Sequence, residues 1–147
     1  MENLAVFSSA FKNNEKIPAK YTVDGERISP PLTIKNTPAN TRSLALILKD
    51  PDAPMGTFIH WVVWNIPSKT REIAENYLPT EAVLGKNTIG KTSYIPPAPP
   101  SGTHRYIFEL YALDIVLPLP VGSSLEQLEK TMAGHVISKA QLMGKYR

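Results

Sequence analysis

Three long apolar segments stand out in the pattern of hydrophobic and polar positions along the chain. They are Ser43–Asp50, Phe58–Asn65 and His104–Asp114. Each is apolar at most positions rather than at alternate ones, and the second is rich in aromatic and β-branched residues. Short runs of this kind, bounded by Pro, Gly or Asn, are typical of buried strands. We therefore expect these segments to be the central strands of a sheet.

Weaker patterns predict further strands towards both ends of the chain. Near the N-terminus the candidates are Leu4–Phe7, Tyr21–Val23 and Leu32–Ile34. After Gly134, apolar or small positions alternate with more polar ones from Val136 to Tyr146. Alternation with a period of two favours a final strand, although a helix remains an alternative for this segment.

Helical signals are few. Ser123–Ala133 carries Leu125, Leu128 and Met132 at helical spacing. Ser123 followed by Glu126 fits a capping box, and Gly134 fits a C-terminal stop. A second, shorter helix is predicted over Lys69–Asn76. Many strands with few helices predict a mostly β fold, a β-sandwich of antiparallel sheets with a few peripheral helices.

Composition narrows the class of protein without identifying it. The 147 residues are most simply one domain, 1–147, with 42% hydrophobic and 20% charged residues. The net charge of +3 is spread along the chain with no basic run, so we expect no nucleic-acid partner. The absence of cysteine excludes disulfides and thiol catalysis. We read no signal peptide and no membrane span, and we expect a cytoplasmic protein.

Prolines shape two parts of the chain. There are fourteen prolines against eight glycines, and they cluster around Ser29–Pro31 and again in Ile95–Pro100. Such runs cannot form helix interiors or central strands. Because proline also stiffens a loop, we interpret 95–102 as a shaped wall rather than a flexible linker.

Two polar blocks at predicted strand ends mark the candidate site. The first is Asp50–Pro54, which leads to His60, and the second is Pro99–Tyr106, which contains His104. Strand alternation points His104 and Tyr106 the same way, and it makes His60 the start of a face continued by Val62 and Trp64. If the strand ends are neighbours, the two imidazoles and the phenol converge with a carboxylate. That set suits a small oxyanion such as phosphate.

The roles within this set have alternatives. Either Asp50 or Asp52 is expected to hold the far nitrogen of an imidazole and favour its charged form. Each histidine could equally be a hydrogen-bonded core residue, and the Asp-Pro run only a turn. Two Asp and two His could bind a divalent metal, but no metal-binding spacing supports this.

The remaining polar and aromatic residues near the site have structural interpretations. Arg105 is predicted to be a surface or strand-pairing residue, and His135 to cap the helix C-terminus. No nucleophile-elbow pattern surrounds Ser101. Trp61 and Trp64 should face opposite sides and lie in the core.

At these residues the chain resembles the phosphatidylethanolamine-binding protein family, also called the Raf kinase inhibitor protein family, and in particular its short bacterial and archaeal branch. The resemblance covers nearly the whole chain. It rests on the segments Tyr21–Glu26, Ser29–Leu32, Asp50–Pro54, His60–Pro67, Gly90–Tyr94, Pro99–Tyr106, Leu110–Asp114, Gly134–Val136 and Gly144–Tyr146. It implies a β-sandwich with peripheral helices and a small anion pocket at one end of a sheet.

Carried over by position, the resemblance implies a pocket built from seven residues. They are Asp50, Asp52, His60, Pro100, Gly102, His104 and Tyr106. Where the family is expected to have glycines after Tyr94, this chain has Ile95–Pro96, whose bulk narrows the mouth or changes the ligands that fit. The resemblance also implies a cis Ala53–Pro54 bond and a homodimer.

The resulting hypothesis is an anion- or phosphorylated-ligand-binding protein without enzymatic activity, cofactor or bound metal. The ligand would be a phosphorylated small molecule, a lipid head group or a phosphorylated side chain, and a kinase or protease could be a regulatory partner. Two alternatives use the same His and Asp residues, a hydrolase and an inhibitor of a protease or kinase. No stable membrane insertion is expected.

Overall fold

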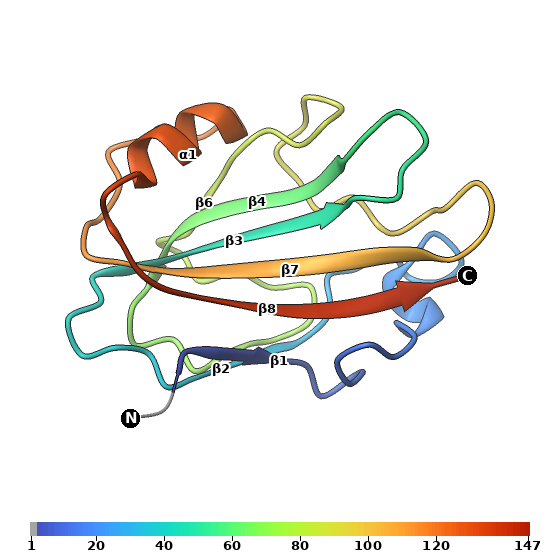
Figure 1. Ribbon diagram of the computed structural model, residues 1–147, viewed down its shortest axis with the longest axis horizontal. Coiled ribbons are helices and arrows are strands. Elements are labelled where there is room, and N and C mark those ends of the chain that lie inside the picture. The colour runs from blue at the N-terminus through green and yellow to red at the C-terminus, as the bar shows by residue number, and fades with distance from the viewer. Residues whose placement is uncertain (1–2) are drawn as a thin grey trace.

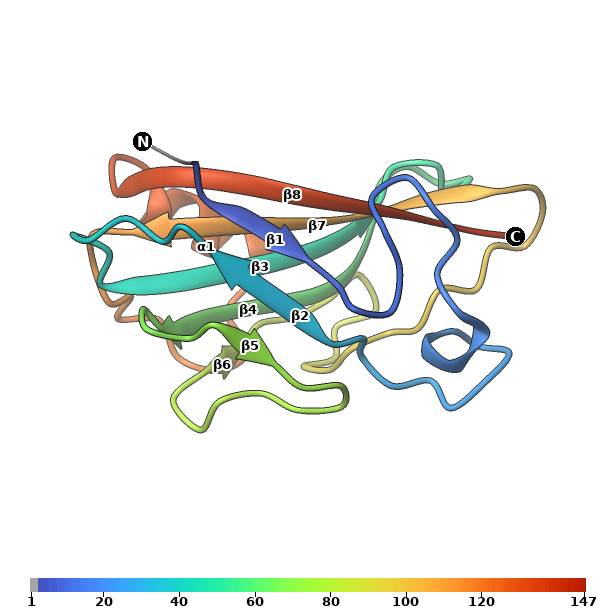
Figure 2. The same ribbon diagram turned by 90° about the horizontal axis from the view of Figure 1, so that it is seen from below.

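Two antiparallel sheets face each other, and one helix covers the outer face of the larger sheet (Figures 1 and 2). The computed structural model describes residues 3–147, so residues 1 and 2 of the predicted domain lie outside it. The small sheet has the order β1-β2-β5 and the large sheet β6-β4-β3-β7-β8. This confirms the predicted mostly β sandwich.

The elements have the following bounds. The strands are β1 Ala5–Phe7, β2 Leu32–Lys35, β3 Ser43–Asp50, β4 Phe58–Pro67, β5 Glu72–Ile73, β6 Val83–Leu84, β7 His104–Leu113 and β8 Val136–Tyr146. The helices are the 3-10 helix η1 Ala19–Tyr21 and the α-helix α1 Leu125–Met132. The three central strands and the final strand are therefore where the sequence predicts them.

Strand alternation divides the core into two layers, one on each face of the large sheet. Along β3, Leu44, Leu46 and Leu48 pack between the two sheets, whereas Ala45 and Ile47 pack beneath α1. Because both faces are covered, β3 is apolar at nearly every position. Trp61 and Trp64 of β4 enter opposite layers, as predicted.

The pairing of β3 with β4 is interrupted at His60. Leu48 pairs with Trp61, but the next residue, Lys49, pairs with Ile59, so His60 is left without a partner across the strand. An extra residue of this kind is a β-bulge, which locally changes the direction of a side chain. The predicted face shared by His60, Val62 and Trp64 is therefore wrong, because the bulge breaks the alternation on which it depends.

Two short predicted elements are also wrong. Tyr21–Val23 is not a strand, because η1 ends at Tyr21 and the Thr22 hydroxyl bonds the Ala19 carbonyl, which closes the turn. Lys69–Asn76 is not a helix. Only Ile73 of this stretch is deeply buried, and it pairs with Leu32 in the small sheet, so no apolar helical stripe exists to pack.

The N-cap of helix α1 is one residue later than predicted. Ser124, not Ser123, accepts the Gln127 backbone N–H, and the Gln127 side chain accepts the Ser124 N–H. His135 meets the C-terminus of the helix through its backbone N–H, which donates to the Met132 carbonyl at 2.8 Å, whereas its ring bonds Asp114, also at 2.8 Å. No helix within residues 3–147 is long and apolar enough to span a membrane.

A second bulge in β4 anchors the segment that leads to α1. Asn65 has a φ of +56°, and its amide donates to the Leu117 carbonyl (2.9 Å) and accepts the Leu117 N–H (2.8 Å). The Asn65 side chain thus pairs both backbone groups of the buried Leu117, as a neighbouring strand would do. Asn tolerates the left-handed conformation better than most residues, which explains its presence here.

We expect Asn65→Ala to lower the free energy of unfolding by about 2–4 kcal/mol, because it leaves both backbone groups of Leu117 unpaired and strains the backbone. Asn36→Ala is the matched control, since Asn36 also has a positive φ (+61°) but makes only an exposed hydrogen bond to Asn3. Urea unfolding measures both. Equal losses would show that the Leu117 contact contributes nothing.

Candidate functional site

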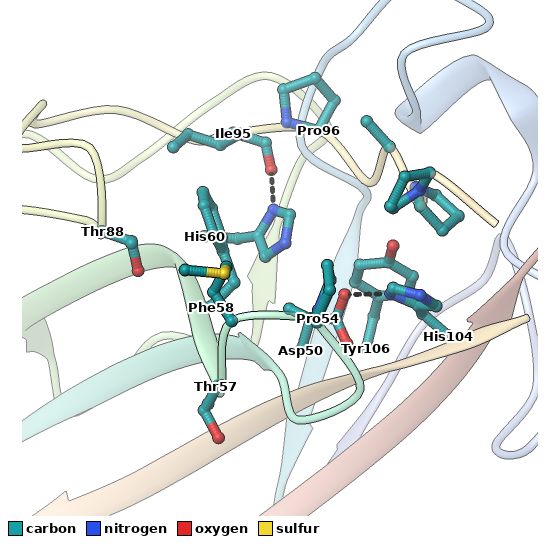
Figure 3. A pocket seen from close by; sticks show the side chains of 16 residues that line it. Asp50, Pro54, Thr57, Phe58, His60, Thr88, Ile95, Pro96, His104 and Tyr106 are labelled. Atoms are coloured by element: carbon teal, nitrogen blue, oxygen red, sulfur yellow. Dashed lines mark hydrogen bonds and ion pairs between the residues drawn. The ribbon is translucent and has the colours of Figure 1, made fainter.

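The candidate site lies where three neighbouring strands meet one edge of the large sheet. In the order β4-β3-β7, the C-terminal end of β3 lies beside the N-terminal ends of β4 and β7. A cavity of about 430 Å³ opens at this edge (Figure 3). Asp50, His60, His104 and Tyr106 all line it. The structure therefore brings together the four residues at the centre of the sequence hypothesis.

Two loops form the apolar walls of the cavity. One is the β3–β4 loop, from Ala53 to Thr57, and the other is the proline-rich loop. From the latter the lining residues are Ile95, Pro96, Ala98, Pro99 and Pro100. This loop is the wall that the proline pattern predicts, and Ile95 and Pro96, where the resemblance leads us to expect glycines, are part of it.

The bulge turns His60 into the cavity. Its ring meets the Tyr106 ring edge-on, with centroids 5.4 Å apart, and its Nδ1 lies 2.7 Å from the Ile95 carbonyl oxygen. Burial lowers the pKa of His60 below its ordinary value, although the Ile95 carbonyl and the charge of Asp50 act in the opposite direction. His60 is therefore biased towards the neutral ring.

His104 is held by a carboxylate instead of a carbonyl. Its Nδ1 lies 2.6 Å from Asp50 Oδ2, and the other carboxylate oxygen accepts the Asp52 N–H at 2.8 Å. Both residues are buried, at 3% exposure for Asp50 and 6% for His104. Asp50 is thus the carboxylate that orients an imidazole, of the two that the sequence left open.

Tyr106 lines the cavity and carries a buried, unpaired hydroxyl. The residue is fully buried, and its hydroxyl has no hydrogen-bond partner within residues 3–147. Burial raises the pKa of Tyr106, and the nearby Asp50 carboxylate adds to the shift although its geometry to the hydroxyl is not that of a hydrogen bond. The phenol is therefore a protonated donor at neutral pH.

Two predicted pocket residues, Asp52 and Gly102, do not line the cavity. Asp52 forms a bidentate ion pair with Arg105 (2.9 and 2.8 Å) and also accepts the Arg105 backbone N–H. Arg105 alternates with His104 and Tyr106 along β7, so it draws Asp52 to the other side of the strand. Gly102 has a φ of +68° and shapes the exposed turn before β7.

Sequence reasoning did not assign Thr57, Phe58, Thr88, Met55 and Gly56 to the cavity, although all five line it. Phe58 packs on His60 with ring centroids 4.7 Å apart. Its place between the Asp50–Pro54 block and His60 was the available signal. Thr88 comes from a separate loop and accepts the Ile59 N–H, and nothing in the sequence points to that contact.

The predicted cis bond at Ala53–Pro54 is wrong, because no cis peptide bond occurs in residues 3–147. The Gly56 N–H donates to the Ala53 carbonyl at 3.1 Å, which closes a four-residue turn. Pro54 is the second residue of that turn, a position that trans proline favours, whereas cis proline occupies the third.

Within the described range, no group of three or more His, Cys, Asp and Glu side chains is arranged to hold a metal ion. Each histidine of the cavity already bonds a protein oxygen through Nδ1. Among residues 3–147, the Tyr106 hydroxyl has no partner, and each of these two imidazoles uses only its Nδ1.

Comparison with known proteins gives consistent matches along the chain. A family model described as phosphatidylethanolamine-binding protein matches residues 7–147. A UPF0098 protein of Methanothermobacter thermautotrophicus is 48% identical over 143 residues, which cover 94% of this chain and 95% of that protein. The names of such relatives carry no enzymatic activity.

Two solved structures are similar in fold over the whole chain. A phosphatidylethanolamine-binding protein homologue of Chlamydia trachomatis is 42% identical, with a TM-score of 0.97 over 100% of this chain and 99% of that one. The Escherichia coli protein YbcL, described as a member of the mammalian family, is 28% identical, with a TM-score of 0.91 over 99% of both chains.

The Asp52–Arg105 pair predicts a specific loss of stability in acid. Hydrogen bonds from the Arg105 side chain, and then from its backbone N–H, lower the pKa of Asp52 from 3.8 to about 2. A carboxylate with a lowered pKa stabilises the fold above its unfolded pKa, and this contribution is lost as pH falls from about 4 to about 2.

We expect Asp52→Asn to remove about 1 kcal/mol of stability at neutral pH, since the pair is partly exposed and screened, and to flatten the decline between about pH 4 and 2. Urea unfolding across this range measures the slope. Glu81→Gln is the control, because Glu81 is exposed and forms no ion pair within residues 3–147. An unchanged acid slope in Asp52→Asn would contradict the assignment.

Proposed function

This chain belongs to the phosphatidylethanolamine-binding protein family, and from the chemistry of its cavity we propose that it binds a small phosphate-like oxyanion. The anion would be free or carried by a phosphorylated molecule. It would occupy the space between His60, His104 and Tyr106, with the proline-rich loop against the rest of the ligand. The proposed role is binding rather than catalysis.

The observation that carries this proposal is the unpaired hydroxyl of Tyr106. Buried polar groups almost always have a partner, because leaving one unpaired costs about 1–3 kcal/mol. Tyr106 lines a cavity of about 430 Å³, and in this proposal a ligand in that cavity supplies the missing acceptor. A protonated phenol needs an oxygen acceptor, and phosphate offers several.

The Asp50–His104 pair supports an anion in spite of its own carboxylate. Each Asp50 oxygen accepts one hydrogen bond from a protein N–H group, which draws the carboxylate towards His104 and the loop backbone. Asp50 thus offers a counter-charge for a protonated His104, whose ring can then donate to an anion. Such charge-assisted hydrogen bonds are roughly twice as strong as neutral ones.

The apolar walls limit what can accompany the anion. Carbon atoms of Pro54, Phe58 and Pro99 line the cavity, and Met55 in the β3–β4 loop is 98% exposed. A ligand with an apolar or small organic group next to its phosphate would meet these surfaces. A highly charged polyphosphate would find no lysine or arginine among the residues that line the cavity.

Tyr106→Phe is predicted to separate binding from stability. Removal of the unpaired hydroxyl should leave the free energy of unfolding unchanged or raise it by up to about 1 kcal/mol. The same change should weaken binding of inorganic phosphate about tenfold, because one hydrogen bond to the ligand is lost. Urea unfolding and titration calorimetry at about pH 6 measure the two effects.

Tyr94→Phe is the matched control. The Tyr94 hydroxyl donates to the Tyr21 carbonyl at 2.8 Å, and the residue does not line the cavity. This variant should lose about 1 kcal/mol of stability and keep its phosphate affinity. Unchanged phosphate affinity in Tyr106→Phe, or no binding of phosphate by the wild-type protein, would refute the proposal.

A further inference from the structure

The two histidines of the cavity differ in the group that contacts their Nδ1 atoms. Nδ1 of His104 faces a carboxylate oxygen of Asp50, whereas Nδ1 of His60 faces the carbonyl oxygen of Ile95 (Figure 3). A carboxylate can balance the positive charge of a protonated ring. A backbone carbonyl has no net charge and can only accept a hydrogen bond.

The carbonyl contact fixes which nitrogen of His60 carries the proton. Because the Ile95 oxygen lies 2.7 Å away and only accepts, Nδ1 must be the donor. In the neutral ring the second nitrogen, Nε2, then has a lone pair and no hydrogen. Figure 3 shows Nε2 on the side of the ring turned towards Tyr106 and His104. His60 therefore presents an acceptor to the cavity.

The surroundings of His60 keep its ring neutral around physiological pH. From the neighbouring strands it faces the carboxylate of Asp50 on β3 and the His104 ring and Tyr106 phenol on β7. The proline-rich loop brings only apolar side chains to the cavity. Burial is the largest influence and lowers the pKa of His60, while the charges of Asp50 and His104 act in opposite directions.

The cavity therefore combines unlike partners around one ligand. Tyr106 donates through its hydroxyl, and His104 can donate when Asp50 balances its charge. His60 in its neutral form accepts. A fully ionised oxyanion has only acceptor oxygens, so one of them would face the lone pair of His60 Nε2. An oxyanion that retains an O–H can donate that proton to Nε2 and satisfy all three groups.

We propose that His60 makes the cavity selective for oxyanions that retain a proton, namely hydrogen phosphate or the monoanion of a phosphomonoester, over fully ionised anions such as sulfate. This inference rests on the proposed function and adds a rule for which ligand, in which protonation state, is bound. One acceptor can select between ligands, because a buried polar group left unpaired or repelled raises the free energy of the complex. The ligand that cannot donate to that group therefore binds more weakly.

Three probes of similar tetrahedral shape separate the protonation states. Sulfate has no proton at any pH of interest. O-phosphoserine loses the last proton of its phosphate near pH 6. Inorganic phosphate at about pH 8 is mostly hydrogen phosphate, which has the same charge as sulfate and one O–H more. The free anion and the monoester also distinguish the two sources of the same phosphate group.

The experiment is titration calorimetry of the wild-type protein with the three probes, from about pH 5.5 to pH 8.5 at constant ionic strength. At about pH 8 we expect inorganic phosphate to bind at least tenfold more tightly than sulfate, the effect of roughly one charge-assisted hydrogen bond. O-phosphoserine should match phosphate at the acid end and weaken towards sulfate as pH rises. Sulfate should bind best at the acid end, where His60 protonates and can donate.

A variant and a spectroscopic measurement make the role of His60 specific. His60→Phe should weaken phosphate about tenfold at pH 8 and leave sulfate unchanged or tighter, because the repelling lone pair is gone. His135→Phe is the control, since His135 is outside the cavity. Should His60→Phe fail to fold, long-range ¹H–¹⁵N correlations on the wild-type protein still test the inference. They should show His60 with its proton on Nδ1.

The outcomes distinguish this inference from the proposed function. Equal affinity for phosphate and sulfate at pH 8, or a proton on Nε2 of neutral His60, overturns the inference while the anion pocket stands. Equal loss of phosphate and sulfate in His60→Phe overturns it as well. Absence of binding for all three probes at every pH refutes the proposed function itself.

Discussion

The pocket depends on one interruption of the β3–β4 pairing. The alternation of side chains along a strand would send His60 to the α1 side of the large sheet, with Val62 and Trp64. Tyr106 points the other way, into the layer between the sheets. The unpaired position in β4 reverses His60, so that both rings reach one cavity. Without that extra residue, the same side chains would lie on opposite faces of the sheet.

Two aspartates two residues apart have different structural roles. Asp50 ends β3 inside the protein, where one oxygen orients His104 and the other accepts the Asp52 N–H. Asp52 faces solvent and ties the loop to Arg105 at the start of β7. The outer pair holds two strand ends together, while the inner pair sets the orientation of the imidazole. The division follows from the alternation of His104 and Arg105 along β7.

Much of the fold could be predicted from the sequence because both faces of its central strands are buried. Such strands are continuous apolar runs, so Ser43–Asp50 and its neighbours are visible without a structure. The short elements were not predictable, since two-residue β5 is stabilised by its partner Leu32 and not by its own pattern. The identities of Asp50, His60, His104 and Tyr106 were also accessible, as chemically suitable residues at strand ends.

The sequence did not reveal the directions in which these side chains point. A bulge depends on the register of two strands, which no local pattern records, and so the orientation of His60 was mispredicted. The choice between Asp50 and Asp52 depends on which side of β7 each one meets. The contacts of Thr88 and the Ile95 carbonyl are long-range, and they arise only once the sheet has placed separate loops beside it.

The proline-rich wall has a consequence for the speed of ligand exchange. Four of the six residues from Ile95 to Pro100 are prolines, which fix the backbone and offer no N–H group. Little freedom remains to be lost when a ligand enters, so entry need not wait for a loop to become ordered. Those prolines cannot donate backbone hydrogen bonds to a ligand either, so the residence time of the proposed anion would be set largely by the side chains of the sheet. Arrival and departure are thus governed by different parts of the pocket.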